Sequence, residues 1–185
     1  MSKKVKIVAV VGMAGSGKTT VCDFFREKGY PVLRFGDETD IGLKELGKEI
    51  NAKNEKWFRE KLRKDLGMEA YAVKIKPRIE RAINRDKVVI LDGLYSWEEF
   101  IYLSEFFDNF YLLCVYAKPE IRYRRLGERK VRPFTDDEAK SRDIAEIVNL
   151  HKGGPIAFCD HLIVNEGEKE DLEGKIENFL KIIND

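Results

Sequence analysis

Residues 12–19 have the types and spacing needed to bind the phosphates of a nucleotide. Glycines let a backbone curl so that its N–H groups point at an anion, and a helix N-terminus adds partial positive charge. Lys18 is expected to bridge the β and γ phosphates, and the Thr19 hydroxyl to hold Mg²⁺. A glycine-rich turn that binds nothing is the alternative, but this motif directly follows an apolar run and opens a helix. The predicted phosphate-binding residues, which fit G-x-x-x-x-G-K-[ST] and one position beyond it, are Gly12, Met13, Ala14, Gly15, Ser16, Gly17, Lys18, Thr19 and Thr20.

Two aspartates follow expected strands and are candidates for catalysis. Asp92 closes the apolar run 87–92, so its carboxylate should emerge beside the phosphate loop, at the edge where open α/β sheets bind ligands. There it is expected to hold Mg²⁺ or to orient an acceptor substrate, unless it only starts an Asp-Gly turn. Asp37 follows the second expected strand and could accept a proton from an acceptor hydroxyl. A loop residue or a helix cap is an equally good interpretation of Asp37.

A cluster of arginines is the third candidate group. Arg122, Arg125 and Arg129 are spaced i, i+3 and i+7, which predicts one shared helical face, and Arg142 lies one helix later. Guanidinium groups neutralise the charge that phosphoryl transfer spreads over oxygen atoms, and a mobile flap carrying them could also exclude water. The alternative is a solvated helix surface with salt bridges.

The remaining sequence predicts the strands and helices that position these groups. Apolar runs alternate with longer charged segments, which indicates an α/β fold with a parallel sheet and helices on both faces. The segment 41–84 is expected to be helical with breaks near Asn54 and Gly67, and Pro77 is expected to kink its last helix. On this segment Arg59 and Arg63 could grip an acceptor phosphate or could simply lie on a helix surface. Strands are expected at 5–11, 31–35, 87–92, 110–117 and 161–164, and the other helices at 18–28, 96–107, from 119, 135–151 and 170–183.

Composition narrows the function classes. The 185 residues carry 34 basic and 33 acidic side chains, a formal charge of +1, so no global field recruits nucleic acid or anionic membrane. The longest apolar run is far shorter than the roughly 20 residues that span a bilayer, and the motif at Gly12 argues against an export signal. Three scattered cysteines indicate reduced thiols and a cytoplasmic protein. Nucleic acid is therefore an improbable partner, and the oligomeric state is left open.

Several motifs in order resemble those of the P-loop nucleoside monophosphate kinases. They are the phosphate loop, Phe35-Gly36-Asp37, Asp92-Gly93, the arginine-rich segment and the stretch 160–165. The chain looks most similar to the dephospho-CoA kinase and adenylate kinase-related branch, including archaeal members. That resemblance implies a five-stranded parallel core, an acceptor-binding helical insertion and a lid. On this basis the expected core comprises residues 1–37, 85–120 and 155–185. The expected insertion covers about 38–84, and the expected lid covers about 121–145.

The same resemblance implies roles for individual residues. ATP and Mg²⁺ are the expected cofactors, with Thr19 and Asp92 at the metal and a nucleotide-like small molecule as acceptor. Asp37 and Asp92 are expected by the acceptor, and the lid arginines Arg125, Arg129 and Arg142 join Lys18 as catalytic candidates. Asn165 and Gly167 are expected to border the adenine.

Departures from the family pattern leave the acceptor open. The arginine that adenylate kinases carry after Asp-Gly is missing from the stretch that follows Asp92, and dephospho-CoA kinases carry a lid glutamine that this chain lacks. A hydroxyl acceptor would profit from a carboxylate base, whereas a phosphate acceptor needs mainly positioning. A nucleotide-dependent switch or NTPase acting on a protein partner is the alternative function. A nucleic-acid end kinase is a third, weaker one.

Overall fold

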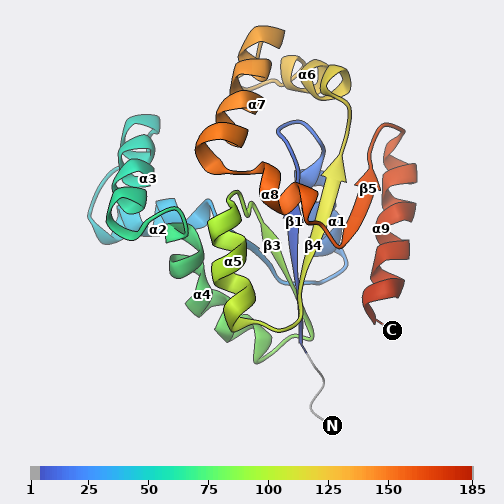
Figure 1. Ribbon diagram of the computed structural model, residues 1–185, viewed down its shortest axis with the longest axis horizontal. Coiled ribbons are helices and arrows are strands. Elements are labelled where there is room, and N and C mark those ends of the chain that lie inside the picture. The colour runs from blue at the N-terminus through green and yellow to red at the C-terminus, as the bar shows by residue number, and fades with distance from the viewer. Residues whose placement is uncertain (1–4, 185) are drawn as a thin grey trace.

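The computed structural model describes residues 5–184. The charged start at residues 1–4, which resembles that of an export signal, lies outside the described residues. Within residues 5–184 one sheet contains all the expected strands, in the order β2-β3-β1-β4-β5 and parallel throughout (Figure 1). The α/β fold with a five-stranded parallel sheet is therefore confirmed. The strands are β1 (Lys6–Val11), β2 (Val32–Arg34), β3 (Val88–Asp92), β4 (Phe110–Tyr116) and β5 (His161–Val164).

The first strand lies at the centre of the sheet. β1 pairs Val10 with Asp92 of β3 on one side, and with Leu113 of β4 on the other. Chain order reverses around β1, and crevices for ligands form where such a reversal meets the carboxyl ends of the strands. The loop that follows β1 is therefore placed where this fold binds ligands.

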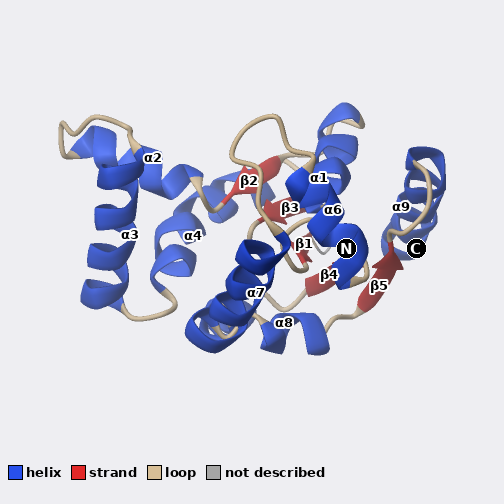
Figure 2. Cartoon of the chain, turned by 90° about the horizontal axis from the view of Figure 1, so that it is seen from above, coloured by secondary structure: helices blue, strands red, loops and turns tan. Residues whose placement is uncertain are grey.

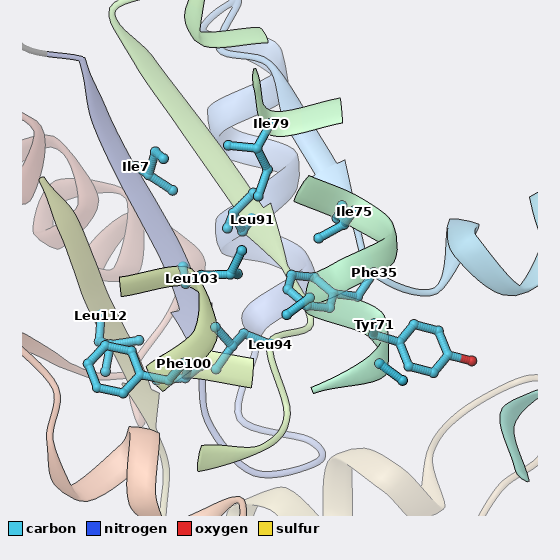
Figure 3. Close-up of a cluster of buried hydrophobic side chains, with 14 of the residues drawn as sticks. Ile7, Phe35, Tyr71, Ile75, Ile79, Leu91, Leu94, Phe100, Leu103 and Leu112 are labelled. Carbon is cyan, nitrogen blue, oxygen red and sulfur yellow. The ribbon is translucent and has the colours of Figure 1, made fainter. Parts of the chain in front are cut away.

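Alternation along the strands divides their apolar residues between two cores. Ile7 and Ala9 face a cluster with Ile75, Phe100 and Leu103 (Figure 3). Val8 and Val10 face the opposite cluster, which holds the buried side of α1 (Lys18–Glu27) and α9 (Lys169–Asn184). Because successive strand residues point to opposite faces, a continuous apolar run is what a strand covered on both sides requires.

The remaining helices form two groups beside the carboxyl edge of the sheet. In Figure 2, seen from above, α2, α3 and α4 stand to one side of the strands, while α6 and α7 lie over the carboxyl ends. The segment 41–84 is helical where the sequence predicts it. Its last helix, α4, does not end at Pro77 but continues through it. The short α8 was not predicted. The bounds are α2 (Asp37–Glu45), α3 (Ala52–Leu66), α4 (Ala70–Ile83), α5 (Trp97–Phe106), α6 (Pro119–Gly127), α7 (Asp136–Leu150) and α8 (Gly153–Ala157).

Three expected helix boundaries are corrected by the structure. The break near Asn54 lies earlier, because Asn51 caps α3 by accepting a hydrogen bond from the Asn54 amide at 3.0 Å. Asp37 opens α2 and does not stand in a loop. α6 ends at Gly127, so Arg129 is not on the helix and does not share a helical face with Arg122. Among the described residues, no helix is both long and apolar enough to cross a membrane.

Candidate functional site

The phosphate-loop residues lie between β1 and α1, with backbone conformations that require glycine. Gly12 has φ 142°, and a Cβ there would lie 2.3 Å from the Val115 carbonyl oxygen of β4. Gly15 has φ 79°, and a Cβ there would lie 2.6 Å from the Arg122 carbonyl oxygen of α6. The loop is therefore pressed against both β4 and α6, and a side chain at either position would force it apart.

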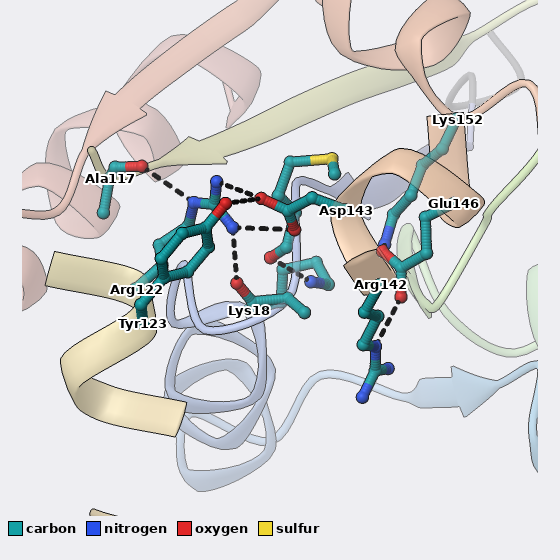
Figure 4. Close-up of polar contacts among 10 residues, drawn as sticks. Lys18, Ala117, Arg122, Tyr123, Arg142, Asp143, Glu146 and Lys152 are labelled. Atoms are coloured by element: carbon teal, nitrogen blue, oxygen red, sulfur yellow. Dashed lines mark hydrogen bonds and ion pairs between the residues drawn. The ribbon is translucent and has the colours of Figure 1, made fainter. Parts of the chain in front are cut away.

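Arg122, on α6, holds the phosphate loop and is itself buried. Its Nη1 donates to the Ala14 carbonyl at 3.0 Å, and its Nε donates to the Ala117 carbonyl at 3.1 Å. The two Nη atoms bind the Asp143 carboxylate of α7 at 3.0 and 2.6 Å, and the Tyr123 hydroxyl donates to the same carboxylate at 3.1 Å (Figure 4). Each of these three nitrogen atoms donates a hydrogen bond, and only 5% of Arg122 is exposed. Arg122 therefore links α6, α7 and the phosphate loop.

Asn165 holds the same loop from β5. Its Nδ2 donates to the Ser16 carbonyl at 2.8 Å, and a Cβ at Gly17 would lie 2.2 Å from that nitrogen. Arg125, expected in the lid, donates from Nη1 to the Asn165 carbonyl at 3.0 Å. The Asn165 side chain is thus engaged with the phosphate loop, and that of Arg125 with the backbone that follows β5. The adenine contact expected of Asn165 and Gly167 stays a prediction.

The Lys18 side chain turns back onto its own loop. Its Nζ donates to the Met13 carbonyl at 2.9 Å. Burial lowers the pKa of Lys18 to about 7, and the like charges of Lys152 and Arg142 lower it further against the opposing pull of Glu146 and Asp92. A phosphate would supply the missing negative charge and restore a full ammonium. The electrostatics of the loop therefore favour an anionic ligand.

Thr19 and Asp92, the expected metal residues, carry donor types that suit Mg²⁺. Thr19 stands exposed in the first turn of α1, and Asp92 is the last residue of β3, with its carboxylate 3.5 Å from Arg26. One hydroxyl and one carboxylate leave most octahedral positions to phosphate oxygens and water, which is how Mg²⁺ binds with nucleotides. Residues 5–184 contain no cluster of three His, Cys, Asp or Glu side chains able to hold a metal alone. The donor set therefore fits a cation that arrives with its nucleotide. Thr20, one residue further along α1, lines a small separate hollow with Asp23.

Asp37 forms an ion pair beside the cavity. Its Oδ2 lies 3.2 Å from Nη2 of Arg78 on α4, whose Nη1 binds Glu38 at 2.6 Å. The neighbouring residues Gly36 and Thr39 line a cavity between the α2–α4 segment and the α6–α7 segment, whereas Asp37 does not line it. Engaged with a guanidinium beside the cavity, this carboxylate ties α2 to α4. The expectations that Asp37 lies by the acceptor and serves as a base stay predictions.

A cavity of about 720 Å³ lies between the α2–α4 segment and the α6–α7 segment. Its acidic residues are fewer than its basic ones, and Glu55 and Glu146 both pair with arginines, at 3.6 and 2.9 Å. The hydroxyls of Thr39 and Tyr71, hydrogen-bonded at 2.7 Å, also line it. The structure thus brings two expected lid arginines together with others from across the cavity. The arginines on its walls are Arg34, Arg59, Arg63, Arg129, Arg132 and Arg142.

Three residues that the sequence analysis did not name as candidates, Tyr95, Glu146 and Lys152, form a network at the wall of this cavity, and its charged members lie near enough to Lys18 to affect the pKa of that lysine. Lys152 is 1% exposed, and its Nζ donates to Glu146 Oε2 at 2.5 Å while lying 4.7 Å from the centre of the Tyr95 ring. The other oxygen of Glu146 accepts a hydrogen bond from Arg142 at 2.9 Å. A lysine six positions after a glutamate, across the end of a helix, leaves no periodic signal in the sequence. Tyr95 carries only the signal of standing three residues after Asp92.

Comparison with known proteins gives a consistent family and fold. A family model described as an AAA domain matches residues 8–149. The UPF0200 protein of Sulfurisphaera tokodaii is 32% identical over 183 residues, covering 97% of this chain and 98% of the relative. The UPF0200 protein of Thermococcus gammatolerans is 29% identical over 181 residues, covering 96% and 95%.

Two solved structures share the architecture at low sequence identity. A shikimate kinase from Bacteroides thetaiotaomicron has a TM-score of 0.62 and 14% identity, covering 97% of this chain and 98% of the other. A sugar kinase from Janibacter sp. HTCC2649 has a TM-score of 0.57 and 16% identity, covering 96% and 95%. These similarities show a P-loop kinase-like fold.

Proposed function

The chain belongs to the UPF0200 family and has an AAA domain with a P-loop kinase-like fold, and from this premise we propose that it is a small-molecule kinase. It would transfer the γ-phosphoryl group of ATP, with Mg²⁺, to a nucleotide-like acceptor. The candidate acceptors are a nucleoside monophosphate and dephospho-CoA, as in the branch of kinases that the sequence resembles.

The observation that carries this proposal is the arginine-lined cavity beside the phosphate loop. A volume of about 720 Å³ lies within the range of small-molecule sites, and an excess of guanidinium groups suits a phosphorylated ligand. An enzyme that only hydrolyses ATP, or a switch that answers to a protein, has no need of a second anion site of this size. The cavity therefore supports transfer to a small acceptor.

The side chains suggest how such a transfer would proceed. The loop N–H groups would bind the ATP phosphates, and Lys18 would exchange the Met13 carbonyl for a phosphate oxygen. Arg129 and Arg142 would neutralise charge on the transferring group from the opposite side of the cavity. Bound Mg²⁺ supplies charge neutralisation at the phosphates, and Thr19 and Asp92 are the residues that would hold it.

The cavity favours a phosphate over a hydroxyl as the attacking group. Asp37, the base that a hydroxyl would need, is paired with Arg78 and does not line the cavity. Arg63 and Arg59 stand on α3 across from the lid arginines, where an acceptor phosphate would meet them. A phosphate is already ionised and needs only to be positioned. Of the two acceptor classes, the nucleoside monophosphate is therefore preferred.

A coupled ATP-consumption assay tests this proposal. We expect ADP release to rise at least tenfold when one of the common nucleoside monophosphates is added, and Lys18→Ala to abolish it. Lys118→Ala, at an exposed lysine, is the matched control and should retain the activity. Steady ADP release that no nucleoside monophosphate and no dephospho-CoA changes would favour the alternative, a P-loop NTPase or switch acting on a protein partner.

A further inference from the structure

A buried charge network stands between the phosphate loop and the cavity. Glu146 lies on the cavity wall and accepts hydrogen bonds from two cations, Arg142 at 2.9 Å and Lys152 at 2.5 Å (Figure 4). Arg142 also lines the cavity, whereas Lys152 lies behind Glu146 and over the Tyr95 ring. The two cations therefore differ, since Arg142 faces the cavity and Lys152 faces only its wall.

The arrangement contains more positive than negative charge. Lys18, Arg142 and Lys152 surround Glu146, and Lys152 and Lys18 are close enough that each feels the charge of the other. Asp92, the next acidic group, also lies near Arg26. Like charges at short range in a low-dielectric site repel strongly. An anion entering from the adjoining cavity would therefore be attracted to this cluster.

A purely structural role gives no reason for this arrangement. A buried ion pair can be replaced by apolar residues of similar size without loss of stability, and often with gain. A lysine stem against the Tyr95 ring would pack as well if it ended in a methyl group. The charge of Lys152, placed next to two other cations, therefore needs an explanation from the chemistry of the site.

That explanation lies in the charge of Glu146. With Lys152 removed, the Glu146 carboxylate would have Arg142 as its main partner, and it would cancel the guanidinium charge and repel an incoming phosphate. We propose that Lys152 is a positioning residue: by neutralising Glu146 it leaves the Arg142 guanidinium free to bind the γ-phosphate. The chain turn after α7 is consistent with this role, because His151 adopts φ 51° at the helix end and directs Lys152 inward. This inference rests on the proposed function.

Calorimetric titration of the full chain with Mg²⁺ and two nucleotides tests the proposal. ADP and the non-hydrolysable analogue adenylyl imidodiphosphate differ in the γ-position that Arg142 would bind. We expect Lys152→Met to reduce the preference for the analogue over ADP at least tenfold, while ADP affinity stays within about threefold of wild type. Glu146→Gln should increase that preference, and the double variant Lys152→Met/Glu146→Gln should recover it to near the wild-type value. Lys118→Met is the matched control and should have the wild-type preference.

The outcomes separate this proposal from the proposed function. A folded Lys152→Met protein with the wild-type preference would overturn the role of Lys152 alone, and so would a double variant as impaired as the single one. If Lys152→Met does not fold, Glu146→Gln decides: an increased preference supports the proposal, and an unchanged or reduced one overturns it. If the wild type binds neither nucleotide, the proposed function fails and the role of Lys152 fails with it.

Discussion

Arg63 shows how a single side chain can be held ready for a ligand. Its Nε is buried without a hydrogen-bond partner in residues 5–184, and its guanidinium lies 5.5 Å from the centre of the Tyr71 ring. An unpartnered buried donor costs free energy, on the order of 1–3 kcal/mol. Such a cost is commonly found where a ligand completes the site. Arg63 is therefore the residue at which acceptor binding is best tested.

We expect Arg63→Ala to weaken the acceptor and leave ATP unaffected. Loss of a charge-assisted phosphate contact, about 1.5–3 kcal/mol, corresponds to a rise of about 10–100-fold in KM for the acceptor. KM for ATP should change less than twofold, because ATP binds at the loop. Steady-state kinetics with each substrate varied measures both. Lys61→Ala, on the same helix but exposed and paired with Asp65, is the control. Equal effects on both substrates would contradict the placement of the acceptor.

Glu99 is a second residue whose environment predicts a measurable effect. It accepts hydrogen bonds from the Tyr95 and Ser96 amides at 2.7 and 3.2 Å, and it is 1% exposed. Burial raises the pKa of Glu99 to about 7, from an ordinary value of 4.5. The folded protein therefore binds a proton that the unfolded chain releases between these two values. This group makes the free energy of unfolding fall as pH rises from about 4.5 to 7.

Glu99→Gln should remove that part of the pH dependence. A glutamine keeps the capping-box geometry, since its amide oxygen also accepts from the backbone. The variant should exceed the wild type in stability at pH 8 by on the order of 2 kcal/mol, with little difference at pH 4.5. Urea unfolding across this pH range measures it. Glu138→Gln, in the exposed capping box of α7, is the control, because a lowered pKa places its titration below this range. A parallel pH dependence in Glu99→Gln and wild type would refute the assignment.

At the scale of elements, one buried side chain joins α6, α7 and the phosphate loop. Arg122 forms its bonds to the Asp143 carboxylate and to two carbonyls while almost fully buried. Removing one partner of such a pair leaves an uncompensated charge in the interior. If Arg122 is removed, α6, α7 and the phosphate loop should therefore lose stability together.

We expect Arg122→Met to lower the free energy of unfolding by about 3–5 kcal/mol, because Asp143 would be left buried and unpaired. Arg124→Met, at an exposed position of the same helix, should change it by less than about 0.5 kcal/mol. Urea denaturation followed by circular dichroism gives both values. Similar losses in the two variants would show that the α6 charge as a whole, and not this buried pair, is what matters.

Elements were predictable from sequence to the extent that their signals are local. The continuous apolar strands and the Ser96–Glu99 and Thr135–Glu138 capping boxes depend on neighbouring residues, and the structure contains them. The helix α6 shows the limit of prediction from local signals. The arginine spacing predicted that Arg129 shares a helical face with Arg122, but α6 ends at Gly127. Gly127 is a local signal for that end, because glycine weakens a helix, but the arginine spacing alone does not register it.

The site was predictable only in its continuous part. The phosphate loop is one segment, so its pattern identified it and the fold placed it at the centre of the sheet. Arg122 depends on Asp143, and Asn165 depends on Ser16 far earlier in the chain. Pairings of this kind arise from tertiary packing, so one sequence contains no record of them. Lys152 was missed for the same reason. Arg59, Arg63, Arg129 and Arg142 were named as candidates, but nothing in the sequence predicted that they line one cavity.

At the scale of the whole molecule, charge is balanced overall but concentrated in one place. The formal charge is +1, yet six arginines line a single cavity. Mutual repulsion of these groups destabilises the folded state when no anion is bound. A bound nucleotide should therefore stabilise the entire fold.

We expect ADP with Mg²⁺, at 100 times its Kd, to raise the free energy of unfolding by about 2.7 kcal/mol, because it binds the folded state alone. For a chain of this size the unfolding midpoint should rise by about 5–10 °C. Scanning calorimetry measures the shift, with sodium chloride at equal ionic strength as control. A shift of the same size in Lys18→Ala would show that the stabilisation does not come from the phosphate loop.

The central position of β1 has a consequence for how the protein is made. β1 leaves the ribosome well before its neighbours β3 and β4, with Ile7 paired to Val89 and Phe110. Pairings so distant in sequence form slowly, and an apolar strand waiting for them is prone to association with other chains. Nascent chains shorter than about 110 residues should therefore depend on chaperones, and the nucleotide site should mature only once β4 has emerged.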